Sequence, residues 1–237
     1  MNRDLDFLRL CKLNGLGLAA VQLDTLQYYV KLLLDWNLKV NLVSRKDESN
    51  VWVGHILHSL LPLARIEIPP DSFVLDLGTG GGLPGIPVAV ARPDLRVTLL
   101  DSVRKKTEAL QDIVAKLDLK NVEVKWGRAG ELKLRNLHTV GFDVVLARAV
   151  APLKDLIKWS HDLVRRNSAA APKASFTGTK ASFKLPFLIA MKGGDVHDEI
   201  KKAQIRYKDS QISLVDLLVK GVSEAELVEK KLLVVEL

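Results

Sequence analysis

The sequence predicts an α/β fold, in which a mostly parallel β-sheet with an antiparallel last strand follows an N-terminal helical segment. Three observations support this fold class. Apolar residues recur at helical spacing through about the first 65 residues. Short β-rich runs then alternate with helical stripes, which is typical of a parallel sheet covered by helices on both faces. The last two strand-like runs have only a short link between them, so we expect them to pair antiparallel at the sheet edge.

The helical segment contains two amphipathic stripes with spacings of three and four residues. The first stripe consists of Leu23, Leu26, Val30 and Leu33, and the second of Val53, Ile56, Leu57, Leu60 and Leu61. The pair Pro69-Pro70 interrupts this pattern and marks a boundary. We therefore predict an N-terminal helical segment over residues 1–67 and a second domain over residues 68–237.

The second domain begins with the alternating strand and helix patterns. The expected strands are Phe73–Leu75, Val97–Leu100, Val122–Val124, Phe142–Leu146, Phe187–Met191, Ile212–Val219 and Leu232–Leu237. Helical stripes lie at Leu110–Leu117 and Leu153–Leu163. One stretch, Arg165–Pro186, departs from this pattern, because it holds five basic residues and no acidic ones among many Ala and Ser. We predict a long, mobile basic insertion at residues 165–186, either an electrostatic arm or a solvated loop without a partner.

Composition limits the classes of protein that are possible. The chain has 237 residues, of which 48% are hydrophobic, and a net charge of +7, which suits a polyanionic partner. No apolar run approaches the roughly 20 residues that span a bilayer. The first ten residues mix acids and bases, unlike a secretion signal or a transit peptide. The single cysteine, Cys11, cannot form an internal disulfide. We therefore expect a cytoplasmic protein without a membrane span. A monomer is favoured, but the sequence does not determine the oligomeric state.

A glycine-rich loop, Asp76–Gly82, follows the first predicted strand and precedes a helix. Glycines lack a Cβ, so this backbone can turn sharply and approach a ligand at the carboxyl end of the strand. Asp101 ends the next strand, where its carboxylate is placed to accept hydrogen bonds from two ribose hydroxyls. The pattern indicates a nucleotide-like cofactor that contacts Gly78, Gly80 and Asp101.

Two cofactors fit such a loop. Counted from Gly78, the loop fails the dinucleotide pattern G-x-G-x-x-G, whereas counted from Gly80 it fits that pattern but lies two residues further from the strand. An acidic residue followed by three alternate glycines is the signature of class I methyltransferases, which bind S-adenosylmethionine. The sequence favours S-adenosylmethionine and leaves a nicotinamide-dependent oxidoreductase as an alternative.

The longer stretch Asp76–Pro87, D-L-G-T-G-G-G-L-P-G-I-P, resembles the glycine loop of the bacterial 16S rRNA guanine-N7 methyltransferases, the glucose-inhibited division protein B family. Agreement over about residues 30–205 includes Trp36-Asn37, Asn41-Leu42, His55–Leu57, Asp101-Ser102, Lys105-Lys106, Leu119–Val122, Arg148–Ala151 and Lys192-Gly193. The resemblance implies a class I, Rossmann-like methyltransferase with small-subunit rRNA or the assembled small subunit as its partner. It also implies cofactor contacts from Gly78, Leu83, Ala129, Gly130 and Arg148.

The chain departs from the family pattern in four places. The family usually has Asp where His58 stands and Glu where Gly130 stands. It usually has a short glycine turn in place of residues 165–186, and a basic residue near the last strand, where this chain has Glu236-Leu237. None of the four departures lies in the glycine loop.

Methylation of guanine N7 needs few catalytic groups, since N7 carries a lone pair and no proton. Placement of the donor and exclusion of water are sufficient, and effective-molarity effects supply roughly 7–11 kcal/mol. We expect Arg148 to pair with the methionine carboxylate or a phosphate, and Lys192 to contact an RNA phosphate or a base edge. The five histidines show no metal-ligand pattern, so we predict no metal, and we expect His58 to pack or cap. A class I methyltransferase acting on a small molecule or a protein, and a non-enzymatic RNA-binding protein, remain further alternatives.

Overall fold

The computed structural model describes residues 3–134, 141–165, 173–178, 182–222 and 230–237, with side chains from residue 6 onward. The helices are α1 (Arg3–Leu13), α2 (Ala20–Asn37), a 3-10 helix (Arg45–Asn50), a π-helix (Val51–Leu57), α3 (His58–Arg65), α4 (Gly85–Ala91), α5 (Arg104–Lys116), α7 (Leu153–His161) and α8 (His197–Arg206). The strands are β1 (Ile66–Glu67), β2 (Phe73–Leu77), β3 (Arg96–Asp101), β4 (Val122–Trp126), β5 (Val144–Arg148), β6 (Lys173–Phe176), β7 (Ser182–Lys184), β8 (Phe187–Gly193), β9 (Ile212–Leu217) and β10 (Lys230–Glu236).

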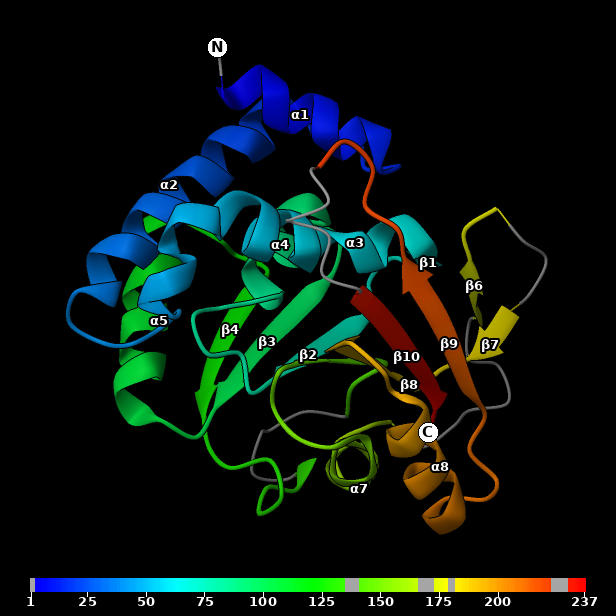
Figure 1. Cartoon of the computed structure of the whole chain (residues 1–237). Coiled ribbons are helices and arrows are strands. Elements are labelled where there is room, and N and C mark those ends of the chain that lie inside the picture. The colour runs from blue at the N-terminus through cyan, green and yellow to red at the C-terminus, as the bar shows by residue number, and fades with distance from the viewer. Residues whose placement is uncertain (1–2, 135–140, 166–172, 179–181, 223–229) are drawn as a thin grey trace.

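A seven-stranded sheet forms the centre of the molecule, with the strand order β4-β3-β2-β5-β8-β10-β9 (Figure 1). Five neighbouring strands of this sheet, β4, β3, β2, β5 and β8, run parallel. The registers of the four adjacent pairs show this. Strand β10 is antiparallel to both of its neighbours, β8 and β9. The predicted mostly parallel sheet with an antiparallel last strand is confirmed.

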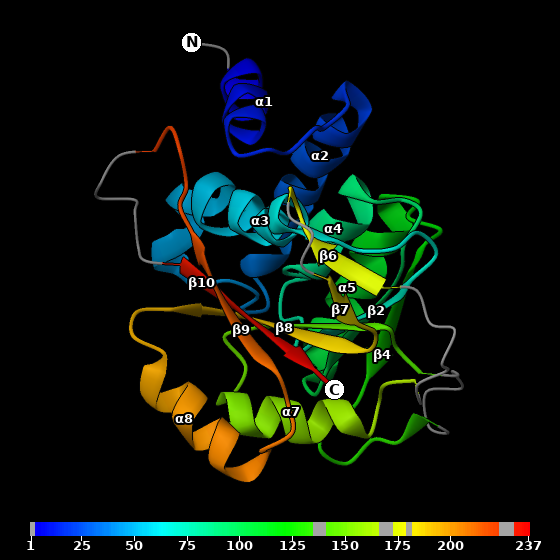
Figure 2. The ribbon, with the colours of Figure 1, turned by 90° about the vertical axis from the view of Figure 1, so that its right-hand side faces the viewer.

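Helices cover both faces of this sheet, in agreement with the alternation in the sequence (Figure 2). Side chains alternate between the faces along each strand. Val74 and Val97 belong to one hydrophobic cluster, together with buried residues of α2, α3, α4 and α5. Leu75 and Leu100 belong to a second cluster, against α7 and α8. The N-terminal helices therefore share a core with the sheet.

The N-terminal segment is helical, as predicted, but its second stripe is divided. Residues Val51–Leu57 form a π-helix, and α3 begins directly after it at His58 and contains Pro62. The spacings of three and four residues predicted an α-helix and did not reveal the π-helical turns. Single π-helical turns are frequent at functional sites.

Part of the segment at 165–186 differs from the prediction. Strands β6 and β7 form a three-stranded antiparallel sheet with β1, on the right in Figure 1. The expectation of a long loop is wrong for these strands, because the apolar residues within them find partners. Phe183 is buried, and its ring packs edge-on against Phe187 at 4.7 Å between centroids. Ala174 and Leu185 are also buried. The predicted loop over residues 166–172 and 179–181 lies outside the described residues.

Candidate cofactor site

The glycine loop turns over the carboxyl ends of β2 and β3. Gly78, Gly80 and Gly82 all adopt positive φ, at 73°, 59° and 95°. These values fall in or near the left-handed region, which glycine enters without steric cost. The amides of Gly78 and Thr79 both donate to the carbonyl of Leu100, at 2.8 and 3.0 Å. The loop is thereby fixed against the end of β3.

Asp76, at the start of the loop, acts within the protein. Its side chain is fully buried, and its Oδ2 accepts hydrogen bonds from Thr79 Oγ1 (2.6 Å) and the amide of Gly85 (2.7 Å). Burial raises the pKa of this carboxyl from 3.8 to about 7, although both hydrogen bonds act in the opposite direction. Asp76 thus joins the two ends of the glycine loop, and it does not line the cavity described below.

Asp101 is held in place by two backbone amides. Its Oδ2 accepts from Gly80 at 2.9 Å, and its Oδ1 accepts from Val103 at 2.8 Å. An ionised carboxylate has about four acceptor positions, so each oxygen can still accept a hydrogen bond from a ligand. The two contacts fix the orientation of the carboxylate before any ligand arrives.

A cavity of about 370 Å³ lies beside the loop at the carboxyl ends of the strands. Its lining brings together four of the predicted cofactor residues: Gly78, Asp101, Ala129 and Gly130. The other residues that line it are Leu77, Leu100, Ser102, Gly127, Arg128, Val150 and Trp159. The size is within the range of small-molecule sites, roughly 300–1,000 Å³.

Two glycines allow close packing in the wall of this cavity. A Cβ at Gly78 would lie 2.7 Å from Val150, and a Cβ at Gly130 would lie 2.8 Å from Trp159 Nε1. Sequence reasoning missed Trp159 because its apolar neighbours in α7 predict only a helix. Val150 lies in the stretch Arg148–Ala151 that carries the family resemblance, but it was not assigned to the site.

Gly80 and Leu83, the other predicted residues of the loop, do not line the cavity. The nearest atom to a Cβ at Gly80 would be the Leu42 carbonyl oxygen, at 3.9 Å, and Leu83 is buried in the core. The hydroxyl of Tyr29 donates to the carbonyl of Gly81 at 2.8 Å. The outer side of the loop therefore packs against the N-terminal segment.

Arg148, the last residue of β5, contacts the π-helix. Its guanidinium donates to the carbonyl of Gly54 at 2.9 Å, and at 3.3 Å to the carbonyl of His55 and to Ser59 Oγ. It also lies 2.6 Å from His55 Nδ1, which must be unprotonated to accept a bond from a guanidinium. Burial and the charge of Arg148 lower the pKa of His55 from 6.5 to about 4. Arg148 does not line the cavity, and its predicted contact with the methionine carboxylate stays a prediction.

His58 lies behind this contact, in the first turn of α3. It is 6% exposed, and neither ring nitrogen has a hydrogen-bond partner among the residues that the structure describes. Burial, followed by the charges of Arg148 and Lys230, lowers the pKa of its imidazole to about 2. This neutral, buried side chain packs, as expected.

Lys192, the other predicted catalytic residue, is bonded within the protein. Its Nζ donates to the carbonyl of Ala151 (2.8 Å) and to Glu199 Oε1 (2.7 Å), and its side chain is 16% exposed. The same Glu199 oxygen accepts from the amide of Leu153, at the start of α7. The contacts tie the end of β8 to α7 and α8, and the proposed contact of Lys192 with RNA remains untested.

Two other expectations concern metals and membranes. In the part of the chain that the structure describes, no group of three or more His, Cys, Asp or Glu side chains is arranged to hold a metal ion. Among the same residues, no helix combines the length and the apolar character needed to cross a bilayer.

Proteins with similar sequences are named as methyltransferases, in agreement with a cofactor cavity beside the glycine loop. The family model described as rRNA small subunit methyltransferase G matches residues 22–175. A protein of Chlorobaculum tepidum named ribosomal RNA small subunit methyltransferase G is 42% identical over 205 residues, which cover 86% of this chain and 83% of the relative. A protein of the same name from Chlorobium luteolum is 39% identical over 194 residues, which cover 82% of this chain and 72% of the relative.

Solved structures show the same fold at low sequence identity. The structure of a fibrillarin/Nop5p complex superimposes with a TM-score of 0.53 at 12% identity, covering 76% of this chain and 79% of the other. A Methanococcus jannaschii fibrillarin, a pre-rRNA processing protein, superimposes with a TM-score of 0.51 at 13% identity. The match covers 76% of this chain and 73% of the fibrillarin. Such values support the class I, Rossmann-like arrangement of the sheet and its helices.

Proposed function

The chain belongs to the rRNA small subunit methyltransferase G family, and we propose that it transfers a methyl group from S-adenosylmethionine to N7 of a guanine in small-subunit ribosomal RNA. The observation that carries this proposal is the cavity of about 370 Å³ beside the glycine loop, with the Asp101 carboxylate on its wall. The substrate is either 16S rRNA or the assembled small subunit.

The residues of the cavity fit S-adenosylmethionine. Asp101, held by the amides of Gly80 and Val103, presents a carboxylate for the two ribose hydroxyls. Gly78 lines the cavity with its backbone and lets Val150 pack closely against it, because a Cβ there would strike Val150. Ala129 and Gly130 follow β4, one strand beyond Asp101, and would take the base. The methionine end would then point across β2 toward β5 and Arg148.

When bound, the cofactor supplies a methyl group that its sulfonium already activates. Guanine N7 brings the lone pair that attacks this methyl, so no residue of the chain has to remove a proton. The remaining task of the protein is to hold donor and acceptor in line and to exclude water, for which placement contributes roughly 7–11 kcal/mol. Asp101 and the glycine loop would fix the donor.

Recognition of the RNA would rest on charge and shape. The net charge of +7 favours association with phosphates, and folded RNA presents accessible bases mainly in loops and bulges. Arg148, which is bonded within the protein, and Lys230 place positive charge at the carboxyl edge of the sheet, although burial lowers the pKa of both side chains. This edge adjoins the site in which the methyl group would lie.

The direct test measures methyl transfer from labelled S-adenosylmethionine to small subunits, and separately to naked 16S rRNA, from cells that lack the gene. N7-methylguanine is then mapped in the product. We expect one labelled guanine, and loss of most activity in Asp101→Ala at cofactor concentrations that saturate the wild type. Labelling of another base or another atom, or of protein alone, would overturn the proposal.

A further inference from the structure

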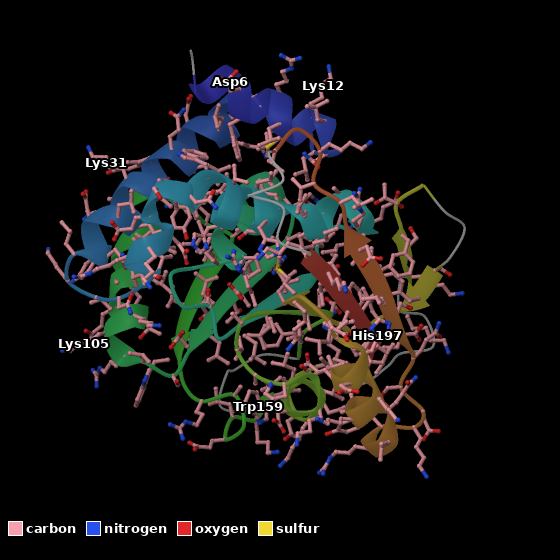
Figure 3. The ribbon with its side chains drawn as sticks, in the orientation of Figure 1. Asp6, Lys12, Lys31, Lys105, Trp159 and His197 are labelled. Carbon is pink, nitrogen blue, oxygen red and sulfur yellow. The ribbon has the colours of Figure 1, made fainter. Side chains whose placement is uncertain are left out.

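Trp159 reaches the cofactor cavity from α7, the helix seen end-on in Figure 3, where this side chain is labelled. The indole is half-buried and packs with Ala129 and Val150 against the second hydrophobic cluster. It is the one aromatic side chain among the described residues that line the cavity. A large flat ring thus forms part of the cavity wall, next to the backbone of Gly130.

Trp159 lies so close to residue 130 that only a glycine fits there without moving the indole. A Cβ at residue 130 would lie 2.8 Å from Trp159 Nε1 and 3.2 Å from Cδ1. Carbon atoms in contact normally lie about 3.5–4.0 Å apart, so a side chain at 130 would displace the indole. Trp159 occupies the space into which a residue at 130 would otherwise extend.

The indole N–H of Trp159 is a hydrogen-bond donor without an acceptor among the described residues. The hydrogen bonds found among the described residues include none from Nε1 of Trp159 or Trp52, whereas Trp36 and Trp126 each donate to a protein acceptor. An indole nitrogen is a donor only, and a buried tryptophan usually finds a partner for it. The geometry therefore leaves a donor that a ligand can use.

The place of the ligand's base follows from the sheet. With the ribose on Asp101 at the end of β3, a base attached to it extends toward β4, where Gly127–Gly130 and Trp159 line the cavity. The ring nitrogens of adenine that carry no proton are acceptors, which complements an N–H donor. We propose that Trp159 determines specificity for the adenine of S-adenosylmethionine, its ring closing the base pocket and its N–H donating to a ring nitrogen. The inference rests on the proposed cofactor.

Calorimetric titration with S-adenosylhomocysteine, the product of methyl transfer, tests both parts. Trp159→Phe keeps a ring and removes the N–H, and we expect a loss of affinity of about two- to tenfold. Trp159→Ala also removes the wall, and we expect about ten- to a hundredfold. Trp52→Phe is the matched control, because Trp52 packs against Phe7 of α1 and does not line the cavity.

Deaza derivatives, in which one adenine ring nitrogen is replaced by CH, identify the acceptor. One derivative should bind more weakly than the parent to the wild type but equally to Trp159→Phe. The intrinsic fluorescence change on ligand binding should also diminish in Trp159→Phe and persist in Trp52→Phe. These readouts distinguish a contact with the base from a general loss of stability, which thermal unfolding of each variant measures.

The outcomes separate this inference from the proposed function. Unchanged affinity and unchanged fluorescence response in Trp159→Phe, with a wild type that binds the ligand, would overturn the role of Trp159 and leave the cofactor site intact. Weaker binding without any coupling to the deaza derivatives would overturn the hydrogen bond. A wild type that binds no S-adenosylhomocysteine would overturn the proposed cofactor itself.

Discussion

Two regions at the carboxyl edge of the sheet differ in how their polar groups are satisfied. The cofactor cavity, over β2, β3 and β4, is open, and glycines, Asp101 and Trp159 line about 370 Å³ of space. At the end of β5, by contrast, the guanidinium of Arg148 donates to Gly54 and His55 of the π-helix and to Ser59 of α3. Small residues and unused hydrogen-bonding capacity indicate a site for a ligand, whereas satisfied polar groups indicate a structural contact.

The largest effect is expected from adding a methyl group to Gly78, in the wall of the cofactor cavity. Gly78→Ala places a Cβ 2.7 Å from Val150 at a φ of 73°, so either the loop or Val150 must move, and both line the cavity. We expect the affinity for S-adenosylmethionine to fall on the order of a hundredfold by calorimetry. Gly178→Ala is the control, because it has a φ of 75° with nothing within 4 Å of the added carbon. Equal affinities for the two variants would mean that Gly78 does not border the ligand.

Arg148 offers the corresponding test on the filled side. Arg148→Ala leaves the carbonyls of Gly54 and His55 without this donor, and buried groups that lose a partner cost about 1–3 kcal/mol. We expect the free energy of unfolding in urea to fall by that amount. Arg92→Ala is the control, since Arg92 also donates to a carbonyl, that of Ile68, but is more exposed. If stability were unchanged and only cofactor affinity fell, Arg148 would act on the ligand, as the family resemblance implies.

The pH dependence of stability contrasts one buried group from each region. The pKa of His58 is about 2 in the folded chain and 6.5 when unfolded, so the unfolded chain binds the extra proton below pH 6.5. The pKa of Asp76 shifts in the opposite direction: it is about 7 in the folded chain and 3.8 when unfolded. The folded chain therefore holds the extra proton between pH 3.8 and pH 7. As the pH falls, His58 therefore lowers stability, whereas Asp76 raises it from pH 7 toward 3.8.

Two variants separate these contributions. Relative to the wild type, His58→Leu should gain stability as the pH falls below 6.5, by up to about 1.4 kcal/mol per pH unit. Asp76→Asn should gain relative stability as the pH rises from 3.8 to 7. Urea unfolding at a series of pH values measures both differences. Parallel curves for His58→Leu and the wild type would show that His58 titrates alike in the folded and unfolded chain.

The same contrast explains what the sequence could predict. The open side is encoded locally, because a strand, a glycine loop and Asp101 follow one another within a short stretch. Gly78 and Asp101 of this stretch line one cavity, together with Ala129 and Gly130, which the family resemblance implied. The filled side depends on a contact between Arg148 and His55, which lie 93 residues apart, and on a π-helix whose apolar spacing resembles that of an α-helix. Single-sequence patterns carry no information on such pairings.

The segment at 165–186 shows the same limit. Its composition predicted a loop, but Ser175 and Glu67, which are 108 residues apart, pair across β6 and β1 and their side chains form a hydrogen bond at 2.8 Å. Phe183 is buried by a partner in β8, Phe187. An apolar residue in a polar stretch is informative only once its contact is known, which is why the distant strand pairing was missed.

The place of β10 in the sheet has a consequence for the order of events during protein synthesis. Strand β9 precedes β10 in the chain, yet in the described sheet it hydrogen-bonds only to β10, which lies between it and β8. A ribosome that has released β9 but still encloses β10 therefore presents an unpaired strand edge, and such edges favour aggregation. The outer part of the sheet can therefore form only after Lys230–Glu236 has left the exit tunnel.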